Sequence, residues 1–156
     1  MTTLKDINVF ITGAGAPGAP GIIKSLRCVS DRKIRIIGGD ASPETSVGAG
    51  LLDRLYRLPV AESPDFTDRL LEICESEHID VLIPLVTREL PVLSRNRHRF
   101  LQHGVTVSVS DPEGLETANN KYLLMKFCRD NGIPAPDFRL VNTLEQFTEA
   151  AQLLGY

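Results

Sequence analysis

Short apolar runs alternate with amphipathic segments through the first two thirds of the chain. Continuous apolar runs are typical of parallel strands buried on both faces. After the first run, Ile22, Ile23, Leu26 and Val29 recur at helical spacing, and Pro20 fits the first turn of that helix. Strands that alternate with helices predict a Rossmann-like, three-layer α/β domain with a mostly parallel sheet of about five strands. The runs cover residues 7–12, 34–39, 55–58, 80–86 and 105–109.

Start and stop signals place the other helices. Ser63 and Pro64 predict the N-cap and first residue of a second helix, and a third is expected to begin near Pro91. After residue 109 the pattern becomes helical: residues 119–131 carry one apolar face and end at Gly132, which prolines follow. A short strand at 138–141 and a helix at 144–154 should complete the chain. We expect a Rossmann-like domain at 1–110 and a helical extension at 111–156.

A glycine cluster lies between the first strand and its helix. It fits the pattern G-x-G-x-x-G, and Asp40 ends the second strand, as in a dinucleotide-binding fingerprint. However, Pro17 and Pro20 remove two N–H donors where a pyrophosphate would need them. Nicotinamide cofactor binding, an anionic group of another ligand and a purely structural turn all remain open from this loop alone. The glycines are Gly13, Gly15 and Gly18.

The composition excludes some classes of partner but indicates no particular function. The 156 residues are 42% hydrophobic and 24% charged, and the net charge of -3 gives no general field that would hold a polyanion. No apolar stretch approaches the ~20 residues of a membrane span, and the N-terminus lacks the pattern of a signal peptide. We therefore expect a cytoplasmic protein without a nucleic-acid or membrane partner.

Cysteines and histidines give no metal signature. Three cysteines lie far apart among apolar residues in helical stretches, so buried free thiols are favoured over a disulfide or a metal site. The histidines have no carboxylate or thiol at metal-ligand spacing, which favours solvated side chains. No metal site and no catalytic residue are predicted. The residues are Cys28, Cys74, Cys128, His78, His98 and His103.

Three segments carry a resemblance to a known family. VFITGAGAPGAPGIIKSL (9–26) looks like the first βα unit of a pre-ATP-grasp domain, and DVLIPLVTREL (80–90) resembles a strand that ends near a substrate crevice. The most specific is NNKYLLMKFCRDNGIPAPDFRLVNTLEQFTEAAQLLGY (119–156), which is similar to the family's D-K, helix, G-I-P-x-P, strand, helix, L-G-Y succession. Over essentially its whole length the chain resembles ATP-grasp enzymes, especially those like the large subunit of carbamoyl phosphate synthase.

The resemblance implies particular site residues. Lys121 matches the lysine that reaches the nucleotide phosphates, while Asn120 replaces the family's acidic residue. Arg88 and Glu89 follow the strand at 80–86, beyond the carboxyl end where a doubly wound sheet binds ligand, although surface ion pairing is the alternative. The expected substrate-crevice residues are Gly13, Gly15, Ala16, Pro17, Gly18, Arg88 and Glu89.

The family's chemistry supplies the functional expectation. With ATP and Mg²⁺, such a ligase activates a small carboxylate as an acylphosphate and transfers the acyl group to an amine or similar nucleophile. The second phosphate-binding lysine, the glycine-rich flap and the Mg²⁺ carboxylates of the family are absent here. We therefore expect a truncated, inactive fragment that binds no cofactor tightly and whose partner is the remainder of the ATP-grasp domain, with homo-oligomerisation left open.

Two alternatives belong to other functional classes. One is an NAD(P)-dependent Rossmann oxidoreductase or epimerase that uses the glycine loop and Asp40, and the other is a non-catalytic module. Tyr122 and Lys126 do form a Y-x-x-x-K pair, as in many short-chain NAD enzymes. The neighbouring Asn120-Lys121 pair and the GIPAP segment favour the ATP-grasp interpretation over this pair.

Overall fold

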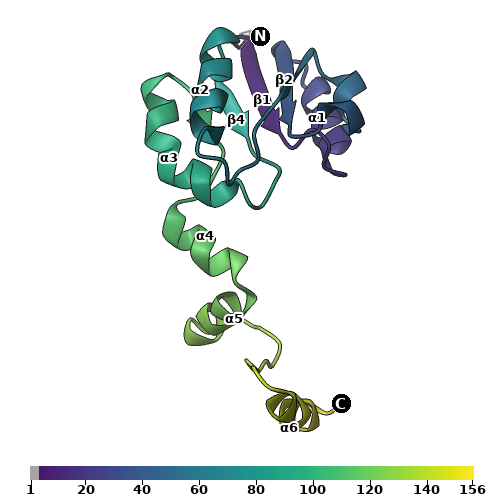
Figure 1. The fold of residues 1–156 in the computed structure, drawn as a ribbon, viewed down its shortest axis with the longest axis vertical. Coiled ribbons are helices and arrows are strands. Elements are labelled where there is room, and N and C mark those ends of the chain that lie inside the picture. Colours follow the sequence, from purple (N-terminus) through teal and green to yellow (C-terminus); the bar gives the residue numbers. More distant parts are fainter. Residues whose placement is uncertain (1–3) are drawn as a thin grey trace. The chain divides into compact units, whose positions relative to one another are not determined.

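Five parallel strands form the centre of the first part of the chain. The computed structural model describes residues 4–156. The strands are ordered β3-β2-β1-β4-β5 and every neighbouring pair is parallel, which confirms the predicted α/β sheet (Figure 1). The strands are β1 (Ile7–Thr12), β2 (Ile34–Asp40), β3 (Arg54–Arg57), β4 (Val81–Ile83) and β5 (Thr106–Val107).

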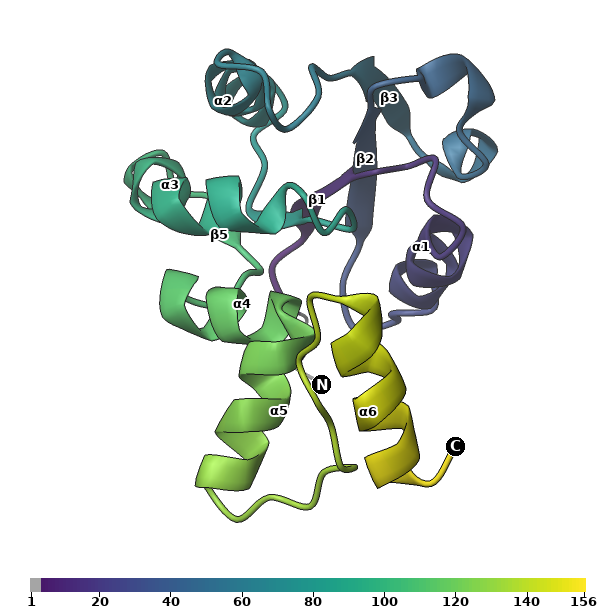
Figure 2. The same cartoon turned by 60° about the horizontal axis from the view of Figure 1, so that its bottom comes forward.

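The sheet is covered by helices on both faces. Helix α1 (Ala19–Arg27) lies on one side of β1 and β2, and α2 (Phe66–Ser76) and α3 (Leu90–Gln102) lie on the other (Figure 2). Alternate strand residues point to opposite faces, so the strands feed two apolar clusters. Between β2 and β3 lie two short 3-10 turns, η1 (Pro43–Thr45) and η2 (Ala49–Leu51). One cluster contains Phe10, Ile37 and Leu82 with residues of α2 and α3, and the other contains Val9, Ile11 and Ile36 with Ala19 and Ile23 of α1.

Two boundaries differ from the sequence pattern. The run at 80–86 is a strand only to Ile83, because Pro84 has no N–H to donate to the ladder. Helix α2 begins at Phe66, so the prediction of Ser63 as N-cap is wrong. Ser63 instead lies in the preceding turn, where its carbonyl accepts from the Phe66 N–H and its hydroxyl contacts Asp65.

Contacts divide the chain into a unit that ends at Pro112 and a second unit, Glu113–Tyr156. The second unit contains α4 (Pro112–Asn119), which starts at the boundary, α5 (Lys121–Asp130) and α6 (Leu144–Leu154). Asn120 is the N-cap of α5, and its Oδ1 accepts from the N–H groups of Tyr122 and Leu123. The predicted stop at Gly132 is confirmed by its left-handed φ of 67°.

No strand forms at 138–141, so that prediction is wrong. Residues 133–142 form neither helix nor strand and pair with no strand among residues 4–156, and a ladder needs a partner. Phe138 instead packs on α5. Its ring lies edge-on to Tyr122 at 5.8 Å between centroids, and the Arg129 guanidinium lies 4.7 Å from its centroid.

The cysteines are all free, but only Cys74 is fully buried, and burial raises the pKa of its thiol to about 12. Cys128 is partly buried. Cys28 is exposed because it follows the last residue of α1, so the prediction of three buried thiols is wrong there. In the described part of the chain, no cluster of three or more His, Cys, Asp or Glu could hold a metal ion. No helix within residues 4–156 is long and apolar enough to cross a membrane.

Candidate functional site

A cavity of about 180 Å³ opens at the carboxyl ends of the central strands. Gly13 follows β1, Asp40 ends β2, and Glu89 follows β4. The sheet order puts β2 and β4 on opposite sides of β1, so the chain changes direction here, which is where doubly wound sheets bind ligands. The cavity is lined by Gly13, Asp40, Ala41, Pro59, Val60, Ala61, Glu62, Val86, Arg88 and Glu89.

Close packing explains two of the loop glycines. Gly13 has a left-handed φ of 65°, and a Cβ at this position would lie 2.5 Å from Cγ2 of Val86. At Gly15 a Cβ would lie 2.9 Å from Oδ2 of Asp40. By contrast, nothing lies within 4 Å of the corresponding point at Gly18. Steric need therefore accounts for Gly13 and Gly15 without a ligand.

The backbone N–H groups of the loop are mostly engaged within the protein. The Gly15 N–H donates to Oδ2 of Asp40 at 2.7 Å, and the Asp40 Oδ1 accepts from the Ser42 N–H at 2.9 Å. The N–H groups of Ala14, Ala16 and Ala19 donate to backbone carbonyls. Together with the two prolines, these bonds leave few donors for a pyrophosphate. Asp40 fastens the loop, and the NAD(P) alternative is not favoured.

Glu89 is the most buried charged residue at the cavity, with 8% of its surface exposed. The hydroxyl of fully buried Thr12, the last residue of β1, donates to its Oε2. Burial, reinforced by the nearby charge of Asp40, raises the pKa of Glu89 to about 7 against the opposing effect of the Thr12 hydrogen bond. Thr12 was not predicted as a site residue, although it is the polar end of an otherwise apolar run.

The other predicted crevice residues divide into two groups. Arg88 lines the cavity, but its side chain is 81% exposed and lies 3.5 Å from the carboxylate of Glu62. Gly15, Ala16, Pro17 and Gly18 are not among the lining residues, and the last two are exposed. The structure therefore brings Gly13, Arg88 and Glu89 together around one cavity.

Lys121 lies in the second unit. It is the first residue of α5, directly after the Asn120 cap, and it is exposed. Within residues 4–156 its side chain makes no hydrogen bond or ion pair. Its role at a nucleotide stays a prediction.

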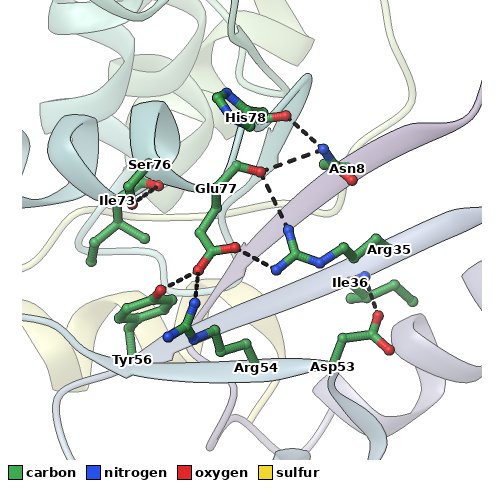
Figure 3. Close-up of polar contacts among 10 residues, drawn as sticks. All are labelled: Asn8, Arg35, Ile36, Asp53, Arg54, Tyr56, Ile73, Ser76, Glu77 and His78. Atoms are coloured by element: carbon green, nitrogen blue, oxygen red, sulfur yellow. Dashed lines mark hydrogen bonds and ion pairs between the residues drawn. The ribbon is translucent and has the colours of Figure 1, made fainter.

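A second buried carboxylate lies at the opposite, amino-terminal ends of the strands. Glu77 follows α2, is 4% exposed, and accepts from Arg35 on β2 and from Arg54 and Tyr56 on β3 (Figure 3). The hydrogen bond from Tyr56 and the two guanidinium groups hold the pKa of Glu77 below its usual range despite burial. Asn8 of β1 adds hydrogen bonds to the carbonyls of Glu77 and His78. We assign this cluster a structural role.

Comparison with known proteins identifies a family that matches the first unit and relatives that match about three quarters of the chain. The model of the PylC-like N-terminal domain family matches residues 9–108. The carbamoyl phosphate synthase large chain of Pseudothermotoga lettingae is 23% identical over 122 residues, which are 78% of this chain and 10% of the relative. That of Buchnera aphidicola is 27% identical over 118 residues, 75% and 10% respectively. The chain thus spans about a tenth of the length of these relatives.

Solved structures of carboxylases share the fold. The biotin carboxylase domain of a single-chain bacterial carboxylase has a TM-score of 0.58 at 18% identity and covers 96% of this chain and 34% of its own. Pyruvate carboxylase of Rhizobium etli gives 0.60 at 14%, covering 97% and 14%. A 2-oxoglutarate carboxylase domain of Hydrogenobacter thermophilus, solved with MgADP and bicarbonate, gives 0.57 at 16%, covering 96% and 33%.

The family match covers nearly two thirds of the chain and includes every strand of the sheet except the first two residues of β1. The relatives are the ones that the sequence resemblance named, so that resemblance is confirmed. The chain belongs to the PylC-like N-terminal domain family and is related to the carbamoyl phosphate synthase large chain.

Proposed function

We propose that the chain is the opening part of an ATP-dependent carboxylate–amine ligase of the ATP-grasp type. In this proposal the first unit forms part of the substrate crevice, and the second contributes one side of the ATP site. The main support is the cavity at the carboxyl ends of β1, β2 and β4, which lies where doubly wound sheets bind ligands and contains the partly open carboxyl of Glu89.

The second unit supports the proposal through its exposed cation and its exposed apolar face. Lys121 has no partner within residues 4–156 and is therefore available to a phosphate group. A hollow of about 530 Å³ is almost entirely apolar. Faces of this kind normally pack against further protein, and the remainder of an ATP-grasp domain is the partner we propose. The hollow is lined by Arg139, Val141, Phe147, Ala150, Ala151, Leu154 and Tyr156.

The residues described here fit ATP and Mg²⁺ only in part. Bound Mg²⁺ needs carboxylate or phosphate oxygens, and residues 4–156 contain no cluster of metal-binding side chains. ATP-grasp chemistry also needs several cations around the phosphates. Lys121 would supply one of these charges, and the metal ligands would come from further sequence. We expect the chain by itself to bind Mg-ATP weakly and to be inactive.

The test compares residues 1–156 with a protein that carries this chain followed by a complete ATP-grasp domain. Mg-ATP is titrated calorimetrically into both, and into their Lys121→Ala forms. In the longer protein the substitution should weaken ATP binding by about ten- to a hundredfold, because a charge-assisted hydrogen bond contributes about 1.5–3 kcal/mol. Lys126→Ala is the matched control, since Lys126 lies on the same helix but pairs with Asp130.

Two results would contradict the proposal. Micromolar binding of Mg-ATP by residues 1–156 would mean that a complete site already exists. Unchanged ATP affinity in the longer Lys121→Ala protein would make Lys121 an ordinary surface lysine. ADP release that depends on both a carboxylate and an amine would support the ligase chemistry directly.

A further inference from the structure

We infer that a basic hollow at the amino-terminal ends of β2 and β3 is a second ligand site, which binds a small organic phosphate monoester. It lies at the edge of the sheet opposite the cavity beside Glu89 and shares no residue with it, so the inference goes beyond the proposed function. Its volume of about 490 Å³ is within the ~300–1,000 Å³ of typical small-molecule sites. The basic hollow is lined by Leu26, Arg27, Val29, Arg32, Lys33, Ile34, Arg35 and Asp53.

Charge is the first observation. Four cations and only one carboxylate line the basic hollow, although the whole chain has a net charge of -3. Two of the cations are already paired: Arg27 lies 2.8 Å from the carboxylate of Asp53, and Arg35 donates to the buried Glu77 (Figure 3). Two positive charges therefore remain without a matching acid among the lining residues. They would attract an anion into the hollow.

Open donors are the second observation, and they belong to the two remaining cations, Arg32 and Lys33. The exposed side chain of Lys33 makes no hydrogen bond or ion pair within residues 4–156. Arg32 contacts the Asp31 carboxylate only through Nε, at 3.5 Å, so both of its terminal nitrogens are left as donors. The nearby Asp6 accepts from the backbone N–H of Lys33 and not from its ammonium group. An ammonium group and a guanidinium group are thus available to one anion.

The third observation is that one wall of the basic hollow is held by hydrogen bonds. The guanidinium of Arg27 donates to the carbonyls of Ile34 at 3.1 Å and Leu51 at 3.3 Å. Asp53, which pairs with Arg27, accepts from the Ile36 N–H at 2.7 Å. These bonds join the end of α1 to the starts of β2 and β3 and occupy the only acid of the hollow. The wall is therefore in place before a ligand arrives.

Charge and polarity together define the ligand. A phosphate monoester carries about 1.5–2 negative charges near neutral pH, which match the two open cations, whereas a carboxylate carries one. Three apolar residues, Leu26, Val29 and Ile34, line the same hollow, and Val29 is 40% exposed. An apolar group attached to the phosphate would cover this surface, which inorganic phosphate cannot do. The basic hollow therefore suits an organic phosphate.

The test titrates phenyl phosphate, benzoate and inorganic phosphate into ¹⁵N-labelled residues 1–156 at about pH 7.5, where the phosphates are largely dianions. We expect saturable amide shifts around Val29, Arg32 and Lys33, with phenyl phosphate binding at least about threefold more tightly than either other probe. Benzoate lacks the second charge, and inorganic phosphate lacks the ring.

Single substitutions then separate the two parts of the site. Lys33→Gln should weaken phenyl phosphate binding about three- to tenfold, because one of the two open cations is lost. Lys24→Gln is the matched control: it removes the same charge from an exposed position of α1 that does not line the hollow, and should leave the affinity unchanged. Val29→Ser should weaken the binding of phenyl phosphate but not that of inorganic phosphate.

Four results would overturn the inference. One is the absence of saturable shifts up to about 10 mM phenyl phosphate. A second is an equal loss of affinity in Lys33→Gln and Lys24→Gln, which would mean attraction by overall charge alone. A third is equal binding of benzoate, and a fourth is shifts around Gly13 and Glu89 in place of the basic hollow. Arg32→Gln provides a second variant if Lys33→Gln fails to fold, with the same expected loss.

Discussion

The backbone N–H of Gly15 and the carboxylate of Asp40 are joined by a hydrogen bond of 2.7 Å. In a dinucleotide-binding domain the loop would face the pyrophosphate and the acid would face the ribose. Here the Gly15 N–H donates to Asp40 across the ends of β1 and β2. The N–H of Ser42 donates to the other carboxylate oxygen of Asp40. The fingerprint in the sequence therefore corresponds to a closed turn.

This closed turn predicts that NAD(H) and NADP(H) do not bind at millimolar concentration. The expected result of isothermal titration is dilution heat alone, because the donors that a pyrophosphate needs are engaged or missing. Asp40→Ala should instead lower the free energy of unfolding by about 1–3 kcal/mol, since it leaves the N–H groups of Gly15 and Ser42 without their acceptor. Saturable cofactor binding that Asp40→Ala abolishes would restore the oxidoreductase hypothesis.

Glu89 predicts an unusual dependence of stability on pH. Its folded-state pKa of about 7 lies above the ordinary value of 4.5, so the folded protein holds a proton that the unfolded chain releases between these values. Glu89 destabilises the fold least below about pH 4.5. Its destabilising effect grows as the pH rises from there and is complete above about pH 7. Glu89→Gln should therefore raise the free energy of unfolding at about pH 8 by roughly 1–3 kcal/mol.

The gain should shrink toward zero well below pH 4.5, where native Glu89 is neutral in both the folded and the unfolded state. Urea unfolding of both proteins at a series of pH values measures this difference, and other carboxyls cancel in the comparison. A gain that is independent of pH would mean that the substitution acts through packing.

Glu77 should give the opposite dependence of stability on pH. Its pKa is lowered in the folded state, so its contribution is present above its ordinary pKa and is lost as pH falls through the lowered value. Glu77→Gln should lower the free energy of unfolding at neutral pH by about 1–3 kcal/mol, because Arg35 and Arg54 lose their charged acceptor. Glu72→Gln, which breaks an exposed pair with Arg69, should change it by less than about 0.5 kcal/mol. Equal losses of unfolding free energy for the two variants, measured by urea unfolding, would show that the Glu77 cluster stabilises the fold no more than an exposed ion pair does.

Alanine substitutions at two glycines should change the stability of the protein in opposite directions. Gly13→Ala combines a left-handed φ with a Cβ contact of 2.5 Å to Val86, and should destabilise the protein by about 1–3 kcal/mol. Gly21 lies inside α1 with nothing within 4 Å of a new Cβ, so Gly21→Ala should stabilise it by about 0.5–1 kcal/mol. Thermal unfolding of both variants tests the pair. A tolerated Gly13→Ala would mean that β1 and the loop shift easily.

Strong local signals account for what the sequence predicted. Apolar runs and glycine or proline punctuation gave five strands, α1, α6 and the end of α5, since these depend on neighbours in the chain. The start of α2 was missed because Ser63 and Asp65 are both plausible caps, and the side chain of neither caps the helix. The strand at 138–141 was predicted wrongly because β structure depends on a partner strand, and periodicity does not show whether one exists.

The site was predictable only as separate pieces. Gly13, Arg88 and Glu89 could be placed at strand ends, but their meeting at one cavity follows from the order of the strands. The contact between Thr12 and Glu89 joins residues 77 positions apart, and no local pattern signals it. Likewise, the fingerprint correctly marked Gly15 and Asp40 but not that they bond to each other.

The Glu77 cluster fastens β1, β2 and β3 at the edge of the sheet opposite the cavity. The contacts of the Glu77 cluster therefore do not depend on any residue that lines the cavity. If the cavity binds substrate as proposed, substitutions at Val60 and Ala61 would change what it accepts while the Glu77 cluster keeps the strands in register. One edge of the sheet could then diverge without loss of the polar contacts at the other.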